Sequence, residues 1–341
     1  MRVLFVSKAV EAPWNDSSKN LVRDVSQGLT RYTPTTMVSR DGGPGTLPVY
    51  AGKSRFAPGL AAQVRVMAAL LRDRRHALWH FFFAPNPKSG LAGRAATALR
   101  RRPSVHTVCS LPTRHAASFF ATRTVVLSQR TERLLQSWGQ PCVRIPPALT
   151  PPAAPTEAER ESAREAFGLT SGRPVVVYAG DLEFGGGAET VVRAFQDDVQ
   201  LVMACRRKTA QADAEAARLK ALAHPSARWV GETPSIHALL GAADAVVLPA
   251  TTTYAKMDYP LVLLEAMAMK RPTVVTAGTA AEELTDGGAI ASAPGPGALR
   301  EATRRALQDG PRESFRAYVC ERFSPTAVAA AYEALYDELL P

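Results

Sequence analysis

Short runs rich in β-branched and aromatic residues alternate with amphipathic stretches along the whole chain, and this alternation constrains the fold most strongly. It is typical of parallel β-sheets whose strands are connected by helices. We expect strands near residues 3–7, 35–39, 78–83, 104–109, 124–127, 143–145, 174–179, 200–204, 228–230, 245–249, 272–276 and 289–291. The helices expected between them include residues 18–29, 59–72, 89–101, 188–195, 212–223, 235–242, 263–269, 298–308 and 326–339. The sequence therefore predicts an α/β protein.

A proline-rich stretch separates two halves of similar size. Residues 145–160 read IPPALTPPAAPTEAER and contain five prolines, which argues against regular secondary structure there. Because the strand–helix pattern restarts afterwards, we predict two Rossmann-like, doubly wound domains that face each other across a cleft. The predicted parts are an N-terminal domain, a linker, a second domain and a final helix, at residues 1–150, 151–172, 173–323 and 324–341.

The chain is basic, with 41 lysines and arginines against 31 aspartates and glutamates and a net charge of +10. Such a balance suits phosphorylated ligands, an anionic membrane surface or nucleic acid, and it can equally reflect an arginine-rich composition. Basic residues cluster at 72–75, 100–102 and 206–208, without the aromatic spacing of a nucleic-acid groove. The pattern argues against nucleic acid and leaves the other three explanations open.

Cysteine usage and hydropathy bear on the cellular compartment. The four cysteines are scattered without a CxxC pair, which argues against a disulfide framework or a zinc site. No apolar run approaches the roughly 18 residues that span a bilayer. Residues 1–7 (MRVLFVS) read as a strand rather than as part of a signal peptide. We therefore predict a cytoplasmic protein. The positive charge would also suit peripheral association with the inner face of the membrane.

The segment after the first expected strand argues against dinucleotide and P-loop chemistry. A Rossmann cofactor site needs GxGxxG directly after a strand. Here that segment reads SKAVEAPWNDSSKN and contains no glycine, and no Walker pattern occurs elsewhere. We predict that the protein carries no nicotinamide or flavin cofactor.

Three loops in the second half carry residues suited to an anionic ligand. Gly185, Gly186 and Gly187 precede a helix, where bare backbone N–H groups would face an anion, although the run could also be a flexible connection. The next strand ends in CRRKT, whose Arg206 and Lys208 suit diphosphate oxygens. The third loop, ATTTYAKMDYP, combines hydroxyls with Lys256 and Asp258 directly before a helix. We also expect Pro260 and Leu261, at the start of that helix, to bind the ligand.

The third loop runs into PLVLLEAMAMKRPTVVT and then GTAAEEL, and these motifs resemble the signature of the retaining, GT-B-fold glycosyltransferases that use nucleotide sugars, the group usually numbered four. The resemblance extends to MRVLFVS, VVLSQRTERLL, RIPPAL and ERFSPTAVAAAYEALYDELL, and so to nearly the whole chain. It implies an acceptor site on the first domain and a nucleotide-sugar site on the second. It also implies that the residues after about Ser324 pack back on the first domain.

The resemblance implies roles for individual residues. Glu265 matches the second glutamate of the family's paired motif, which accepts hydrogen bonds from the donor ribose, as a carboxylate can. The first glutamate, which contacts the donor sugar, is replaced by Met257, and Asp258 is the nearest substitute. The family's two basic diphosphate ligands correspond to Asp181 and Gly186. We expect Arg206, Lys208 and then Lys256 to supply the missing charge, and Asp181 to turn away or to hold an arginine.

In the first half, two residues are candidates for the acceptor side. Asp16 lies in NDSSK, and the resemblance implies that this loop closes over the sugar phosphate and the acceptor. Asp16 could instead simply cap the next helix. The family's N-domain histidine falls at Cys109, and His80, on the preceding strand, is the alternative; His80 could instead be a structural core imidazole.

The resemblance implies a metal-independent glycosyltransferase that moves a sugar from a nucleoside diphosphate (UDP or GDP) to an acceptor with retention at the anomeric carbon. In the family the leaving phosphate itself accepts the acceptor proton, so no protein base is strictly required. No bound cofactor is expected. The acceptor could be a sugar, a lipid-linked molecule or a small molecule. The alternative is a non-catalytic nucleotide-sugar-binding homologue that acts as a scaffold, which the departures at Met257, Asp181 and Gly186 favour.

Overall fold

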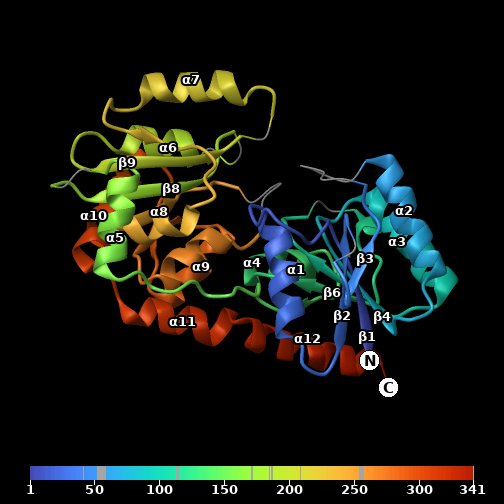
Figure 1. Cartoon of the computed structure of the whole chain (residues 1–341). Helices are drawn as coiled ribbons and strands as arrows, with labels where there is room; N and C mark the ends of the chain where they lie inside the picture. The colour runs from blue at the N-terminus through green and yellow to red at the C-terminus, as the bar shows by residue number, and fades with distance from the viewer. Residues whose placement is uncertain are drawn as a thin grey trace. The chain divides into compact units, whose positions relative to one another are not determined.

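The structure is a computed structural model that describes residues 1–40, 42–51, 59–112, 115–169, 172–183, 185, 187–207, 209–252 and 257–340. The chain divides into two compact units. Unit 1 comprises Met1–Thr150, Tyr254–Tyr259 and Arg322–Pro341, and unit 2 comprises Pro151–Thr253 and Pro260–Glu321. Each unit is built on one parallel sheet with helices between successive strands, which confirms the predicted α/β class (Figure 1).

Unit 1 contains a seven-stranded sheet in the order β3-β2-β1-β4-β5-β6-β7. Its strands are β1 (Arg2–Val6), β2 (Thr33–Val38), β3 (Thr46–Pro48), β4 (Leu78–Phe83), β5 (Ser104–Val108), β6 (Arg123–Val126) and β7 (Val143–Arg144). The connecting helices are α1 (Ser17–Gly28), α2 (Leu60–Arg72), α3 (Pro87–Arg100), the 3-10 turn η1 (Ala116–Ser118) and α4 (Gln129–Ser137). The order reverses between β1 and β4, which is the switch point of a doubly wound sheet.

Unit 2 contains a six-stranded sheet in the order β10-β9-β8-β11-β12-β13. Its strands are β8 (Val175–Asp181), β9 (Gln200–Arg206), β10 (Arg228–Trp229), β11 (Ala245–Leu248), β12 (Thr273–Thr276) and β13 (Ile290–Ser292). Its helices are α5 (Glu157–Ala166), α6 (Gly187–Ala194), α7 (Ala212–Leu222), α8 (Ile236–Ala242), α9 (Leu261–Ala268), η2 (Ala280–Gly287), α10 (Pro296–Asp309) and α11 (Glu313–Phe323). The switch point here lies between β8 and β11.

Helix α5 corrects the prediction that the whole proline-rich stretch is irregular. Its prolines end at Pro155, and the helix starts two residues later. Thr156 accepts a hydrogen bond from the backbone of Glu159, whose side chain bonds back to the N–H of Thr156. This capping box satisfies two terminal donors and starts the helix inside the predicted linker.

The final helix, α12 (Pro325–Leu339), packs on α1 within unit 1. The two helices touch closely at Gly28, where a Cβ atom would lie 2.1 Å from the carbonyl oxygen of Pro325. Farther along α12, Glu333 accepts hydrogen bonds from the backbone N–H groups of Thr30 and Arg31 and pairs with the Arg31 side chain. Close packing at Gly28 and hydrogen bonds to the buried carboxylate of Glu333 therefore hold α12 against α1 and the residues that follow it.

Among the helices in the described part of the chain, none is long and apolar enough to cross a membrane.

Candidate functional site

The loops that follow β8, β9 and β11 form the candidate donor site of unit 2. These strands are parallel and adjacent, so their carboxyl ends lie at one edge of the sheet. The loops are also bonded to each other: Thr251 donates through its backbone N–H (3.0 Å) and its hydroxyl (2.9 Å) to the carbonyl oxygen of Gly185. In doubly wound sheets, ligands bind outside the carboxyl ends of the strands at the switch point, which here is the position of this loop pair.

The glycines of the first loop serve packing as well as backbone access. Gly185 has a φ of +85°, a conformation that favours glycine. Gly187 opens α6, and a Cβ atom there would lie 3.3 Å from the hydroxyl oxygen of Tyr178. That hydroxyl donates to the carbonyl oxygen of Asp181 (2.8 Å), and burial raises the pKa of Tyr178 well above its usual value. Gly187 therefore makes room for a buried neutral tyrosine. Gly186 lies outside the described residues.

Asp181 and Arg206 form an ion pair across β8 and β9. The sequence analysis expected Asp181 either to turn away from the ligand or to hold an arginine, and the structure shows the second arrangement. They are register partners, and Nη2 of Arg206 lies 3.1 Å from Oδ1 of Asp181. The aspartate side chain is 6% exposed and that of the arginine is 35% exposed. The guanidinium therefore reaches the sheet edge with a carboxylate already beside it, and Lys208 lies outside the described residues.

Glu265 lies on α9 next to a histidine that the sequence did not single out. Its Oε1 is 3.4 Å from Nε2 of His237, on the first turn of α8, and its own side chain is 13% exposed whereas that of His237 is 52% exposed. Most of α9 is buried, so Glu265 is a polar group on a mainly apolar helix. No local motif marks His237, because it precedes Glu265 by 28 residues and only packing brings the two side chains together.

The start of α9 carries the last two predicted donor positions. Pro260 is the N-cap residue, makes no side-chain cap and, as a proline, has no N–H to donate. Leu261 opens the helix with a buried side chain, so only its backbone N–H could serve an anion. The helix terminus is therefore uncapped by any side chain, as an anion-binding terminus requires.

The structure argues against the predicted role of Asp258 at the donor sugar. Asp258 is fully buried in unit 1, where its carboxylate accepts a short hydrogen bond from Ser128 and its backbone N–H donates to Cys109. A carboxylate without exposed surface cannot meet a ligand in this arrangement. Met257, beside it, is half-buried, and Lys256 lies outside the described residues.

In unit 1, Asp16 lies at the corresponding switch point beside the end of β1. It is the N-cap of α1, and its Oδ1 accepts from the backbone N–H of Ser18 at 2.9 Å. Its Oδ2 lies 3.0 Å from Nζ of Lys8, which follows β1. Burial acts to raise the pKa of Asp16, but Lys8 and the hydrogen bonds of Ser18 outweigh it and hold this pKa well below the usual value. The capping role is therefore present, and Lys8 is a second charged group that the sequence analysis missed.

His80 is a core residue, and its predicted catalytic role is wrong for this structure. The side chain is fully buried in the middle of β4, with Nδ1 2.6 Å from the hydroxyl of Tyr336 and Nε2 2.7 Å from that of Thr107. Burial, followed by the neighbouring His106, lowers the pKa of His80 well below its usual value. A neutral imidazole with both nitrogens bonded internally links the sheet to α12 and cannot reach a substrate. At the position that matches the family histidine, burial raises the pKa of Cys109 to about 12.

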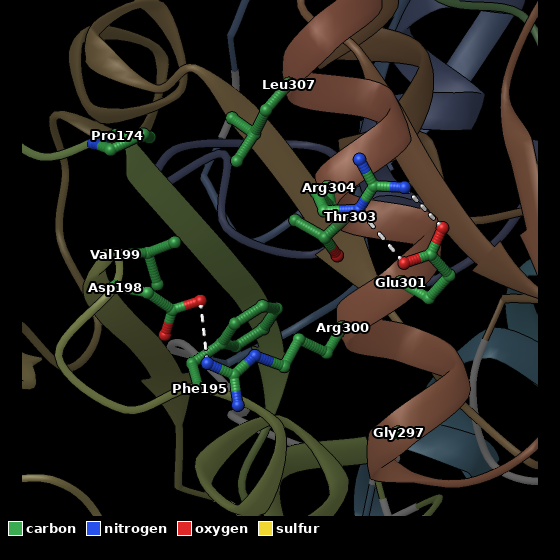
Figure 2. Close-up of a pocket in the computed structure, with 10 residues that line it drawn as sticks. All are labelled: Pro174, Phe195, Asp198, Val199, Gly297, Arg300, Glu301, Thr303, Arg304 and Leu307. Carbon is green, nitrogen blue, oxygen red and sulfur yellow. Dashed lines mark hydrogen bonds and ion pairs between the residues drawn. The ribbon is translucent and has the colours of Figure 1, made fainter.

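A pocket at the other end of the unit 2 sheet is distinct from these loops (Figure 2). Pro174 and Val199 on its wall directly precede β8 and β9, so it lies at the amino ends of the strands. Its rim is an ion pair between Arg300 and Asp198 (3.1 Å) and a second pair within α10. Within the described ranges, no cluster of His, Cys, Asp and Glu could hold a metal ion.

Comparison with known families identifies the second α/β unit. Residues 173–309 match the family model Glycosyl transferases group 1. The match covers most of unit 2 and less than half of the chain. The resemblance read from the sequence is thereby confirmed. No curated protein matches the chain by sequence.

Solved structures extend the likeness of the glycosyltransferase domain to the whole chain. HepE from Anabaena, solved with UDP and glucose, has a TM-score of 0.78 at 16% identity and covers 99% of this chain and 100% of its own. Sucrose-phosphate synthase from Thermosynechococcus elongatus has a TM-score of 0.78 at 19% identity and covers 99% of both chains. A glycosyltransferase from Rickettsia africae has a TM-score of 0.74 at 15% identity and covers 99% of this chain and 98% of its own. At these identities the likeness shows a shared fold, two parallel α/β units like those of the GT-B structures.

Proposed function

We propose that this protein is a retaining glycosyltransferase that transfers a sugar from a nucleoside diphosphate sugar to an acceptor bound by unit 1. The observation that carries the proposal is the group of loops after β8, β9 and β11, in which Gly185, Arg206 and the helix bearing Glu265 follow adjacent strands of a glycosyl transferases group 1 domain. HepE, which has this fold, was solved with UDP-glucose, so UDP-glucose is the first donor to test.

In the proposed site each group acts on a different part of the donor. Glu265 would accept hydrogen bonds from the ribose hydroxyls, because a carboxylate is a pure acceptor. Arg206 would neutralise the diphosphate, together with backbone N–H groups at the starts of α6 and α9. Charge on the departing nucleoside diphosphate would be stabilised by these fixed donors without a metal ion or bound cofactor. Retention would follow if the leaving phosphate accepts the proton of the acceptor hydroxyl on the same face.

Unit 1 would supply the acceptor side through the start of α1. Lys8 and Asp16 lie together at the switch point of its sheet, and the Asp16 carboxylate is partly exposed. We assign to this pair the positioning of an acceptor hydroxyl rather than proton abstraction, because a carboxylate with so low a pKa is a weak base. A cytoplasmic location is part of the proposal, since nucleoside diphosphate sugars would have to reach the site.

A second function, nucleotide-sugar binding without turnover, is favoured by two observations. Arg206 already pairs with Asp181, and Met257 stands at the position of the family's sugar-binding glutamate. A protein of this kind would bind the nucleotide but lack the contacts that stabilise the departing group.

Incubation with a panel of UDP- and GDP-sugars separates these functions. Release of UDP or GDP, followed by a coupled assay with and without sugar, lipid-linked and small-molecule acceptors, is the expected result for the enzyme. The configuration at the anomeric carbon of any product, read from its proton coupling constant, tests retention. Binding by calorimetry without release would support the scaffold, and neither binding nor release with any donor would contradict both proposals.

A further inference from the structure

Helices α2 and α3 of unit 1 expose large apolar side chains to solvent. On α2, Leu60, Val64 and Leu71 are 78%, 61% and 37% exposed. They are spaced four and seven residues apart, so they follow one line along the helix. On α3, Leu91 and Leu99 are 65% and 72% exposed. The two helices are in contact and lie side by side on one flank of unit 1 (Figure 1).

The inner faces of both helices already have partners in the fold. Leu70 of α2 belongs to the buried core beneath β1 and β4, with Val66 and Met67 packed against that core. On α3, a Cβ atom at Gly90 would lie 1.8 Å from the carbonyl oxygen of Ala117, and one at Gly93 would lie 2.4 Å from the ring of Phe120. The inner faces of α2 and α3 are therefore buried within unit 1. Packing within unit 1 does not explain why large apolar side chains stand on the outer faces.

The same part of the surface is strongly basic. Residues 60–102 contain nine lysines and arginines and one aspartate, Asp73. The single carboxylate is used internally, because it contacts Nδ1 of His76 at 2.8 Å and accepts from Nε1 of Trp79 at 2.7 Å. Several exposed basic residues make no ion pair within the described part of the chain: Arg65, Arg72, Arg74, Arg75, Lys88 and Arg101. Arg65 and Arg72 are one heptad apart, so they form a basic line that lies roughly 100° around α2 from the apolar line.

We infer that this surface, defined by the exposed apolar and basic residues of α2 and α3, docks on an anionic lipid bilayer. Apolar side chains flanked by arginines suit the boundary between headgroups and acyl chains, where each part finds a partner. A second copy of the chain would bring two faces of the same charge together across a two-fold axis, which disfavours a homodimer. The inference rests on these helices alone and does not depend on the donor site.

Vesicle co-sedimentation of the full chain tests the inference. We expect binding to phosphatidylcholine vesicles that contain about one third phosphatidylglycerol, and weak binding to phosphatidylcholine alone. Arg65→Gln with Arg72→Gln should lower the partition coefficient roughly 25-fold, since each cation near an anionic surface contributes about 1 kcal/mol. Leu60→Ser with Val64→Ser should weaken binding at every salt concentration, whereas the arginine variant should show a weaker salt dependence than the wild type. Leu222→Ser with Arg305→Gln, exposed positions of the same kinds in unit 2, is the matched control.

Three results would overturn the inference. The wild-type chain could bind both kinds of vesicle equally poorly, or the control could lose as much binding as the arginine variant. Light scattering could instead show a dimer that the serine variant converts to a monomer, which would assign the surface to a second copy. Thermal unfolding of each variant checks that it is folded, because substitutions at exposed positions should leave the melting temperature nearly unchanged.

Discussion

Asp181 and Arg206 are register partners at the carboxyl ends of β8 and β9, with Nη2 of the arginine 3.1 Å from Oδ1 of the aspartate. The aspartate is nearly buried and the arginine is partly exposed. In this arrangement the cation at the sheet edge is offset by a neighbouring anion. A diphosphate would therefore have to compete with Asp181 for the guanidinium.

The first prediction follows from that competition. Asp181→Asn should strengthen UDP binding severalfold, because it removes one negative charge beside the diphosphate while keeping the shape of the side chain. Arg206→Ala should weaken UDP binding about tenfold or more, as expected for a lost charge-assisted hydrogen bond. Calorimetric titration with UDP measures both effects. Unchanged affinity in both variants would show that the diphosphate does not bind near this pair.

The second prediction concerns Glu265 and His237. If His237 orients the Glu265 carboxylate for the ribose, His237→Ala should weaken binding of UDP more than binding of 2′-deoxy-UDP. Glu265→Gln should reduce the preference for the ribose further, by about tenfold, because the amide replaces one acceptor with a donor. His237→Gln, which keeps a donor of similar reach, should restore part of the preference. Equal losses of affinity for UDP and 2′-deoxy-UDP would show that His237 has only a structural role.

The third prediction concerns the pH dependence of stability. Burial lowers the pKa of His106 to about 4, and the pKa of His80 is lowered as well. In the unfolded chain both titrate near the ordinary value of about 6.5, so below that pH the unfolded state binds more protons than the folded state. The free energy of unfolding should therefore fall as the pH drops from about 6.5 towards 4, by up to about 1.4 kcal/mol per pH unit for each histidine.

Urea unfolding at several pH values in that window measures the slope. The His106 ring contacts the rings of Phe83 and Phe120, so phenylalanine should fit there. His106→Phe should reduce the pH dependence of the free energy of unfolding by the contribution of one histidine. A variant as steep as the wild type would mean that His106 is accessible to protons in the folded state.

The fourth prediction concerns the contact between α1 and α12. Gly28→Ala would place a methyl group 2.1 Å from the carbonyl oxygen of Pro325, so α12 would have to move away. We expect a loss of about 1–3 kcal/mol in the free energy of unfolding, the usual cost of overpacking. Gly297→Ala is the matched control, because a Cβ atom there meets nothing within 4 Å and the residue lies near the start of α10. Similar losses in both variants would contradict the tight contact at Gly28.

The sequence by itself determined the α/β class and the glycosyltransferase resemblance. The period of its apolar residues sets the alternation of strands and helices, and PLVLLEAMAMKRPTVV is a local motif that needs no long-range information. It also placed Asp16 at the start of α1 and raised the pairing of Asp181 with an arginine, since both depend on residues next to strand ends.

Only the tertiary structure decided what His80, Asp258 and His237 do. The pattern LWHFFF is compatible with a buried or an accessible imidazole. In the structure, Tyr336 of α12, 256 residues later in the chain, forms a hydrogen bond with the imidazole of His80. Asp258 stands in a loop of the second half of the sequence but is buried in unit 1 by Ser128. His237 meets Glu265 because α8 and α9 pack together. Burial and partnership between distant segments arise from packing, which a local pattern cannot encode.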